Sequence, residues 1–341
     1  MPERVTAMDM YTFSRVFLLA QCIVFVSAIV IVVPSRVKNP HARSSSLFTV
    51  LVLAFVTACN LQAVLLPDAY AGFLFCFSVA WDIYIFSRSA TRHAMIKRGK
   101  TGTGILKQAS DADDLGSKSE GLRKMFHLSG FLIVLCYFVV TPAIAPALSF
   151  VHAFPTVWDA AAGLTAFVLS CGVIAVTAID IQRILFGEAY GMRHLSGIIR
   201  EKEIGAPAAQ TYLLSGAAAS WFIAMICSWF IGPVAMIVSI VAIVMSTFAD
   251  GMAAIIGKAK GKHKVKRPWN QTKSVEGFVA GFVTALLVSL PFLLSFDGGW
   301  LLAIAGSAVL LAIDYASLPI ADNVLNPVAI TIAMEIVVFL L

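Results

Sequence analysis

Charged residues are scarce in this chain. Asp, Glu, Lys and Arg make up only 13% of its 341 residues, whereas soluble domains usually carry about 25%. Hydrophobic residues account for 59%, and the mean hydropathy is +0.88. A soluble core of this size could not bury so much apolar surface, so lipid must be the solvent for much of the chain. We therefore expect an integral, multi-pass membrane protein.

Three familiar signals are also missing. Residues 1–15 have no basic run and no clear small-residue cleavage site, so no cleavable signal peptide is expected. The GxxxxGK[ST] spacing of a Walker loop is absent. There is no CxxC pair, and each cysteine falls in a different apolar segment, which is typical of small buried side chains rather than of disulfides or a zinc site. The six cysteines are Cys22, Cys59, Cys76, Cys136, Cys171 and Cys227.

Ten apolar segments approach the roughly 20 residues that a membrane span needs. The third, seventh and ninth are short. The segments are Phe17–Pro34, Leu47–Leu66, Ala71–Phe86, Leu128–Phe150, Val157–Ile179, Tyr212–Ile231, Pro233–Phe248, Phe278–Phe296, Trp300–Ile313 and Val324–Leu341. The sequence therefore predicts an all-α fold, a polytopic transmembrane helical bundle of about ten spans.

The loop charges give this bundle a direction. With the N-terminus and the C-terminus outside, the inside loops hold 23 of the 25 Lys and Arg residues, and only Arg4 and Arg15 lie outside. The positive-inside rule thus favours this count and orientation. The Gly-, Ser- and Asp-containing stretch 99–121 predicts a flexible cytoplasmic linker between three leading spans, 1–98, and a seven-span core, 122–341. The net charge of +6 is explained by the inside loops, so no nucleic-acid partner is expected.

The stretch from Phe248 to Gly277 carries the most chemistry. Asp250 ends the seventh predicted span, the spaced glycines Gly257 and Gly261 follow, and seven basic residues lie between positions 258 and 273. Glycines let a backbone approach phosphate oxygens, lysines neutralise them, and a carboxylate can hold the bridging magnesium. These are the parts of a nucleoside triphosphate site.

Five lysines in this stretch alternate strictly along the chain. In an extended segment they would share one face, as in a β-ribbon that covers a polyanion. The alternative is a positive-inside loop on anionic lipid headgroups. The five are Lys258, Lys260, Lys262, Lys264 and Lys266.

The two carboxylates of the stretch also have alternatives. Asp250 binds a metal in one interpretation and caps a short helix from Gly251 in the other. Glu276 acts in the site or is a first-turn glutamate that the helix dipole stabilises.

Three further patches lie at predicted cytoplasmic ends of spans. Arg123, Lys124 and His127 lie near one face of a helix, where they can bind phosphate or move a proton, or simply anchor the interface. Glu203, in Arg-Glu-Lys-Glu, can bind metal or accept a proton from an alcohol, or belong to a solvated charge cluster. Asp322 lies in a loop without basic residues and is a metal or ligand candidate, or a helix cap before Pro327.

The predicted orientation places all these groups at one membrane face, the cytoplasmic one. Few ionisable residues fall inside spans, which argues against a transporter. Five motifs in order carry a resemblance: RKxxH with Gly130, REKE-G at 200–205, DxxAxxxGxxxGK at 250–262, KSxEG at 273–277 and DNxxxP at 322–327. Between about residues 121 and 341 the chain resembles the CTP-dependent polyprenol kinase family, which groups dolichol, phytol and diacylglycerol kinases, and more distantly the phosphatidate cytidylyltransferases.

The resemblance implies phosphoryl transfer from CTP to a lipid alcohol, with release of CDP. It places Asp250 and Asp322 on Mg²⁺, and His127, Glu203 or Glu276 in catalysis. It assigns the nucleotide to Gly257, Lys258, Gly261, Lys262, Lys273, Ser274, Arg123 and Lys124. Ser274 and Ala249 depart from the usual Thr and Gly of the family.

Two other functions stay open. The first is a CTP:phosphatidate cytidylyltransferase, although its HGG and DRxD elements are absent. The second is a transporter or scaffold without turnover. The expected location is the cell membrane in a prokaryote or the endoplasmic reticulum in a eukaryote.

Overall fold

The computed structural model describes residues 12, 14–27, 29–30, 40–62, 68–99, 129–144, 154–186, 206–268 and 271–341. Their regular structure is helical apart from one hairpin, as expected for a backbone that must satisfy its own polar groups in lipid. The elements are α2 (Pro40–Leu61), α3 (Asp68–Lys97), α6 (Ser129–Leu135), the π-helix η1 (Cys136–Val140), α7 (Thr141–Ile144), α8 (Val157–Phe186), α9 (Ala209–Ile231), α10 (Val234–Lys260), β1 (Lys264–Arg267), β2 (Gln271–Ser274), α11 (Val275–Leu293), α12 (Gly299–Ala316) and α13 (Asp322–Leu340).

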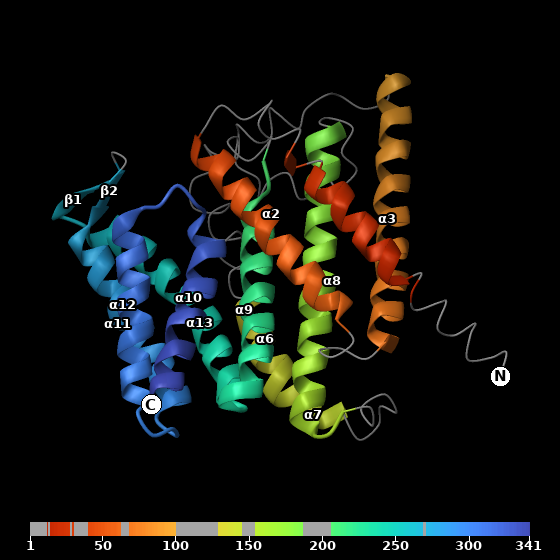
Figure 1. Ribbon diagram of the computed structural model, residues 1–341. Coiled ribbons are helices and arrows are strands. Elements are labelled where there is room, and N and C mark those ends of the chain that lie inside the picture. Colours follow the sequence, from red (N-terminus) through yellow and green to blue (C-terminus); the bar gives the residue numbers. More distant parts are fainter. Residues whose placement is uncertain are drawn as a thin grey trace. The chain divides into compact units, whose positions relative to one another are not determined.

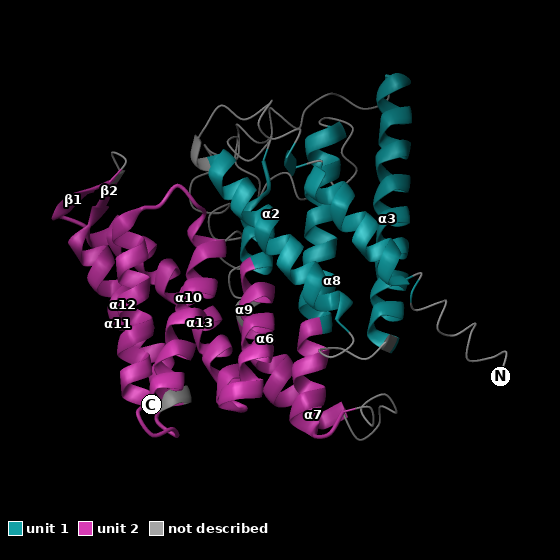
Figure 2. Ribbon diagram, in the orientation of Figure 1, with its two compact units in different colours: residues 1–126, 167–215 teal, residues 127–166, 216–341 magenta. Residues whose placement is uncertain are grey.

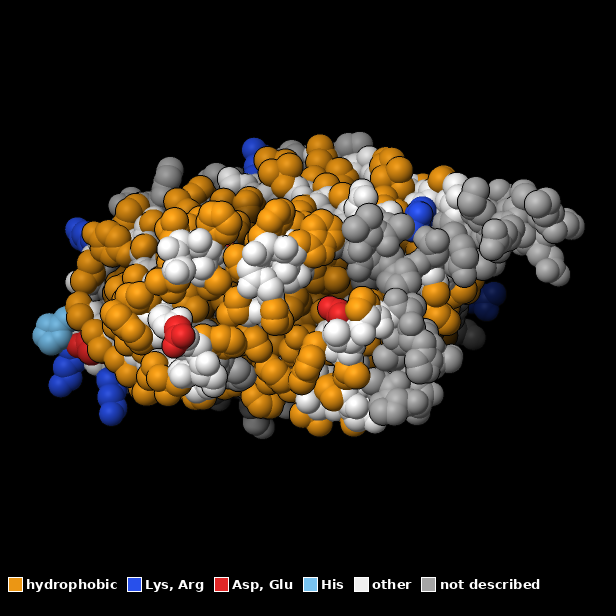
Figure 3. All heavy atoms as spheres, turned by 60° about the horizontal axis from the view of Figure 1, so that its bottom comes forward, with side chains coloured by type: hydrophobic (Ala, Val, Ile, Leu, Met, Phe, Trp, Pro, Cys, Tyr) orange, Lys and Arg blue, Asp and Glu red, His pale blue; other side chains and the backbone are white. Residues whose placement is uncertain are grey.

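Seven helices of the described residues are long and apolar enough to cross a membrane: α2, α3, α8, α9, α10, α12 and α13. Shorter apolar helices, Ser14–Ser27, Phe131–Ile144 and Val275–Pro291, stand at the other three predicted positions. The ten-span count and the orientation stay predictions. The third and seventh segments are not short, because α3 has 30 residues and α10 has 27. Hydrophobic side chains cover much of the described surface on the face drawn in Figure 3, with a few Asp and Glu side chains among them.

The chain forms two compact units (Figure 2). Unit 1 comprises residues 1–126 and 167–215, and unit 2 comprises 127–166 and 216–341. The predicted division into 1–98, 99–121 and 122–341 stays a prediction, and the linker lies, except for Gly99, outside the described residues.

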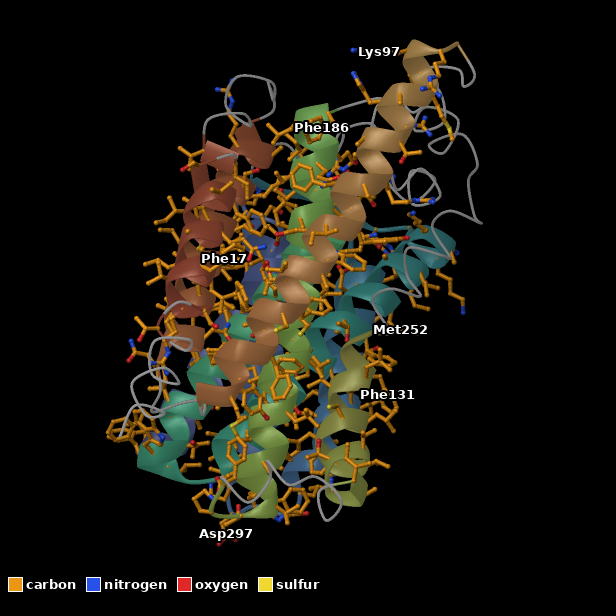
Figure 4. The ribbon with its side chains drawn as sticks, turned by 90° about the vertical axis from the view of Figure 1, so that its right-hand side faces the viewer. Phe17, Lys97, Phe131, Phe186, Met252 and Asp297 are labelled. Carbon is orange, nitrogen blue, oxygen red and sulfur yellow. The ribbon has the colours of Figure 1, made fainter. Side chains whose placement is uncertain are left out.

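Within unit 1, a buried polar cluster joins α8 to the start of α9. Asp180 on α8 accepts hydrogen bonds from the Arg183 guanidinium at 2.8 Å, from the Ala208 backbone N–H at 2.7 Å and from the Thr211 hydroxyl at 2.6 Å. Asp180 therefore satisfies backbone at the start of α9, where helices leave N–H groups unpaired. In Figure 4 the labelled ends of α3 and α8, Lys97 and Phe186, lie at the same end of unit 1.

Four helices, α10 to α13, form the core of unit 2 (Figure 1). Short connections turn the chain between them, with Gly298 (φ 74°) before α12 and Ser317 (φ 47°) after it. The start of α13 also packs tightly against α9, because a methyl group on Gly216 would lie 2.9 Å from the backbone of Asn323 and Val324. The core consists of Val238, Val241, Ala242, Met245, Ala249, Ala285, Leu302, Ala303, Leu310, Ile330 and Met334.

Small residues at four-residue spacing let α10 and α11 approach closely. Such spacing places them along one helix face. A methyl group on Gly277 would lie 3.0 Å from the Ala253 carbonyl oxygen, and one on Gly281 would lie 3.2 Å from the Ala253 Cβ. On α10 and just after it the small residues are Ala249, Ala253, Gly257 and Gly261, and on α11 they are Gly277, Gly281 and Ala285. We call these seven residues the small-residue seam.

Gly261→Ala is expected to destabilise the protein. The new methyl group would lie 2.2 Å from the Gly257 carbonyl oxygen and 2.6 Å from the Ser274 side chain. Overpacking of this kind costs about 1–3 kcal/mol. The melting temperature of the purified protein in detergent should therefore fall. Gly251→Ala on α10 is the control, because its methyl group meets nothing within 4 Å, and equal stability of the two variants would contradict the packing argument.

Candidate functional site

The predicted β-ribbon is present at one end of unit 2 (Figure 1). Strands β1 and β2 are antiparallel, with Val265 opposite Lys273 and Lys266 opposite Thr272. The prediction that five lysines share one extended face is wrong, because Lys258 and Lys260 still belong to α10. The α-helix extends twelve residues past the predicted end of the span at Phe248.

Asp250 lies inside α10, ten residues before the helix ends. It therefore neither ends a span nor caps a helix, and the capping alternative is wrong. Its side chain lines a cleft of about 300 Å³ together with Asp314 of α12 and Asn326 of α13. Phe278 and Gly281 of α11 line the same cleft, so all four helices of the bundle contribute to it.

Asp314 pairs with two cations from the hairpin. Its carboxylate accepts a hydrogen bond from the Lys273 ammonium and lies 3.3 Å from Nη1 of Arg267, which also donates to the Asp314 backbone carbonyl. The side chains are only 11–19% exposed. The Lys273 ammonium also lies 5.3 Å from the centre of the Phe278 ring, a cation–π distance.

The sequence analysis did not identify Asp314 as a site residue, nor its pairing with Arg267. Asp314 directly follows the ninth predicted span at its predicted cytoplasmic end, and this position was the signal that could have found it. Asp322 interacts electrostatically with two other carboxylates, those of Asp250 and Asp314, and with two cations, Lys273 and Arg267. This cluster has one negative charge in excess when all five groups are ionised, which favours a metal cation.

The start of α13 supplies two residues of the site. Asp322 is the first residue of the helix, and the N-cap position is Ala321, so Asp322 does not cap it. Asn326, one turn further on, is only 4% exposed, and its Oδ1 has no hydrogen-bond partner among the described residues. A buried amide oxygen without a partner is costly, and it is also a ligand that Mg²⁺ accepts.

Ser274 and Glu276 hold the hairpin to α11. The Ser274 hydroxyl accepts a hydrogen bond from the Gly277 backbone at 3.1 Å and caps the helix. The Glu276 carboxylate accepts a bond from the His263 backbone at 3.2 Å and pairs with its Nδ1 at 2.7 Å. At the rim, its own backbone N–H and then the His263 side chain lower the pKa of Glu276 to about 2. These contacts favour the first-turn interpretation of Glu276, and its catalytic role stays a prediction.

The glycines of the motif lie in the small-residue seam. Gly257 and Gly261 both face Ser274, and the methyl group of an alanine at either position would lie within 3.1 Å of its hydroxyl. Their spacing therefore has a packing explanation that does not require a phosphate. Lys258 and Lys262 are exposed at the end of α10 and just after it. The roles of all four in binding a nucleotide stay predictions.

Four predicted site residues lie outside the described residues: Arg123, Lys124, His127 and Glu203. Their proposed roles are therefore untested by the geometry. Within the described residues, no group of three His, Cys, Asp or Glu side chains is close enough to hold a metal ion by itself.

A comparison with family models finds one match. The model described as "Cytidylyltransferase family" matches residues 196–317. These residues include Asp250, Lys273 and Asp314, and end before Asp322. No curated protein and no solved structure matches the chain. The family match supports an enzyme that uses CTP and acts on a lipid.

Proposed function

We propose that this protein transfers the terminal phosphoryl group of CTP to the hydroxyl of a membrane lipid alcohol and releases CDP. The observation that carries the proposal is the cleft at the hairpin end of unit 2. Asp250, Asp314 and Asn326 line it, and the hairpin brings Lys273 and Arg267 onto the Asp314 carboxylate. Most of these groups lie in the segment that the cytidylyltransferase model matches.

The residues fit Mg²⁺ as the resident ion. Asp250 and Asp322 would hold it, with the free Oδ1 of Asn326 as a further oxygen. When bound, Mg²⁺ would neutralise the charge that develops on the transferring phosphoryl group. Lys273 and Arg267 are suited to hold phosphate oxygens, since both offer donors from a partly buried position. Lys258 and Lys262 would add charge from the rim.

The lipid alcohol needs a group that orients its hydroxyl and removes a proton. His127 and Glu203 are the candidates from the sequence. The oxygen of the alcohol forms a new bond to the γ-phosphorus of CTP, the bond to the bridging oxygen breaks, and CDP leaves. This transfer depends mostly on positioning and charge neutralisation, which a site of carboxylates and lysines can supply.

A second function, cytidylyl transfer to a lipid phosphate, is favoured by the description of the matching family model. It would use the same CTP and the same metal. The difference is the phosphorus atom attacked, since attack on the α-phosphorus releases pyrophosphate rather than CDP. The absent HGG and DRxD elements favour the kinase.

A nucleotide and lipid panel tests the proposal. Purified protein in lipid nanodiscs is incubated with Mg²⁺, with CTP, ATP, GTP or UTP, and with dolichol, a shorter polyprenol, phytol, geranylgeraniol, diacylglycerol or phosphatidate. We expect CDP to form from CTP only when one of the alcohols is present. Pyrophosphate formed with phosphatidate would support cytidylyl transfer, and no turnover with any pair would contradict both functions.

The orientation has its own test. The sequon Asn270-Gln-Thr272, whose last two residues belong to β2, lies on the predicted inside. We expect no glycan there after expression in a eukaryotic cell, since the glycosylating enzyme works on the opposite side of the membrane. The same sequon moved into the loop after α11, next to Asp297, should be glycosylated. The reverse pattern would overturn the predicted topology.

A further inference from the structure

Unit 1 contains a cavity that the proposed catalytic cleft does not use. It has about 490 Å³ of empty volume, part of which is open to its surroundings. Four helices line it: Ser14–Ser27, α2, α3 and α8. Its apolar wall includes Leu18, Phe25, Leu53, Val56, Leu74 and Ile174.

Cross-helix hydrogen bonds brace the walls of this cavity. Asn60 of α2 accepts a bond from the Ser170 hydroxyl of α8 at 3.0 Å. Gln21 accepts a bond from the Ser78 hydroxyl and donates one to Asp82 at 2.8 Å, which ties the N-terminal helix to α3. Such bonds between lipid-embedded helices stabilise their packing. The cavity is therefore formed by the fold itself before any ligand arrives.

One polar group on the wall is left for a ligand. Thr177 of α8 is only 1% exposed and lines the cavity, and its hydroxyl has no hydrogen-bond partner among the described residues. A buried hydroxyl without a partner costs free energy, which a ligand hydroxyl at hydrogen-bond distance would recover.

The wall also restricts the charge of the ligand. None of the residues lining the cavity, all of them in the described part of the chain, is Asp, Glu, His, Lys or Arg. A phosphate, carboxylate or ammonium group would lose its hydration there without gaining a counter-charge. The wall therefore suits a hydrocarbon chain that ends in an uncharged hydroxyl. Because α2, α3 and α8 are apolar enough to cross a membrane, such a ligand would come from the bilayer.

We propose that this cavity binds an uncharged lipid alcohol, with the hydroxyl end beside Thr177 and the adjoining hydrocarbon among the apolar side chains. The identification of that alcohol as the phosphoryl acceptor rests on the proposed function. The binding itself does not, because it needs neither CTP nor the residues of the catalytic cleft.

Photolabelling without nucleotide tests the binding. The full-length protein in nanodiscs is labelled with a photoactivatable long-chain alcohol, and the labelled peptides are identified by mass spectrometry. We expect labels on peptides of α2 and α8, and competition by the unlabelled alcohol. The fatty acid and the alkane of equal length should compete at least about 3-fold less well, since one is charged and the other lacks the hydroxyl.

Matched variants sharpen the test. Leu53→Trp fills the cavity, whereas Leu51→Trp places the same side chain on the same helix at a position that is 67% exposed. Leu53→Trp should lower labelling at least about 10-fold, as expected for a blocked pocket, and Leu51→Trp should leave it unchanged. Thr177→Val keeps the shape and removes the hydroxyl, so it should lower labelling roughly 3- to 10-fold even if Leu53→Trp fails to fold.

Labelling that is unchanged in Thr177→Val, or that the fatty acid blocks as well as the alcohol, would overturn the proposal. Asp250→Ala separates it from the proposed function. We expect this variant to keep full labelling while it loses CDP formation. If the wild type is labelled but shows no turnover, the proposed kinase activity is wrong and the binding site stands. If it shows turnover but is not labelled, the binding site is wrong and the kinase activity stands.

Discussion

Asp250→Ala is expected to lower CTP-dependent transfer to lipid by at least about 100-fold, the scale of losing one central electrostatic group of an active site. Asp250 lines the cleft with Asp314 and Asn326, and Asp314 is already paired with Lys273 and Arg267. No ion pair joins Asp250 to a cation of the described residues, so Asp250 would be the carboxylate best placed for Mg²⁺. Initial rates of CDP formation measure the effect.

The Asp250 prediction has a second measurement that does not need turnover. Calorimetric binding of CTP to the wild type should tighten with Mg²⁺, and this Mg²⁺ dependence should vanish in Asp250→Ala and in Asp250→Asn. Asp297→Ala is the control, because Asp297 is exposed and lies at the end of unit 2 opposite Met252, which follows Asp250 on α10 (Figure 4). An Asp250→Ala protein with normal activity would remove the metal assignment.

Lys273→Met is expected to raise the KM for CTP by about 100-fold or more, because a partly buried ammonium that holds phosphate contributes a charge-assisted hydrogen bond. The change also leaves the Asp314 carboxylate with only the Arg267 guanidinium as a partner. Part of the loss of activity will therefore come from a lower stability of the fold. Breaking one side of a buried ion pair costs about 3–5 kcal/mol, and less here, since both side chains are nearly one-fifth exposed.

A double variant separates the two effects. In Lys273→Met with Asp314→Asn neither partner is left as an unpaired ion, so the melting temperature should recover toward that of the wild type. If Lys273 holds the triphosphate, the KM for CTP stays high in this stable double variant. If Lys273 only neutralises Asp314, activity returns with stability, and the nucleotide role of Lys273 is wrong.

The pairing of Lys273 and Arg267 with Asp314 also bears on how the site would accept CTP. The carboxylate of Asp314 gives both cations a counter-charge inside a partly buried cluster. The phosphates of CTP would offer Lys273 and Arg267 a stronger counter-charge. Under the proposed function, Asp314 would thus keep these side chains beside the cleft and limit their reorganisation when a triphosphate binds.

From charge placement relative to apolar spans, the sequence predicted that acidic and basic groups from distant segments gather at one end of the bundle. Asp250, Lys273 and Asp322, which are far apart along the chain, do belong to one electrostatic cluster. The hairpin was also predicted from the alternation of lysines, although α10 takes up the first two of them. The helix continues because Gly251–Lys260 has no proline and its small residues pack on α11.

Charge placement could not predict the role of Asn326 or the packing of the glycines. Asn326 is uncharged and lies inside an apolar helix, so nothing in the local sequence distinguishes it from a packing residue. Only the tertiary arrangement shows that its Oδ1 is buried without a partner among the described residues. The glycines differ from Asn326, because their motif is visible in the sequence but has two explanations. Their spacing fits both phosphate access and helix packing, and only coordinates could show that Gly257 and Gly261 face Ser274.

The position of the label that CTP donates tests the central claim most directly. Nanodisc-bound protein with Mg²⁺ and the preferred lipid alcohol receives either γ-labelled or α-labelled CTP, and the extracted lipid is counted and separated by chromatography. We predict that the γ-label alone enters the lipid, as a monophosphate, and that the α-label stays in the aqueous CDP. Label from the α-position in the lipid would contradict the kinase and identify cytidylyl transfer.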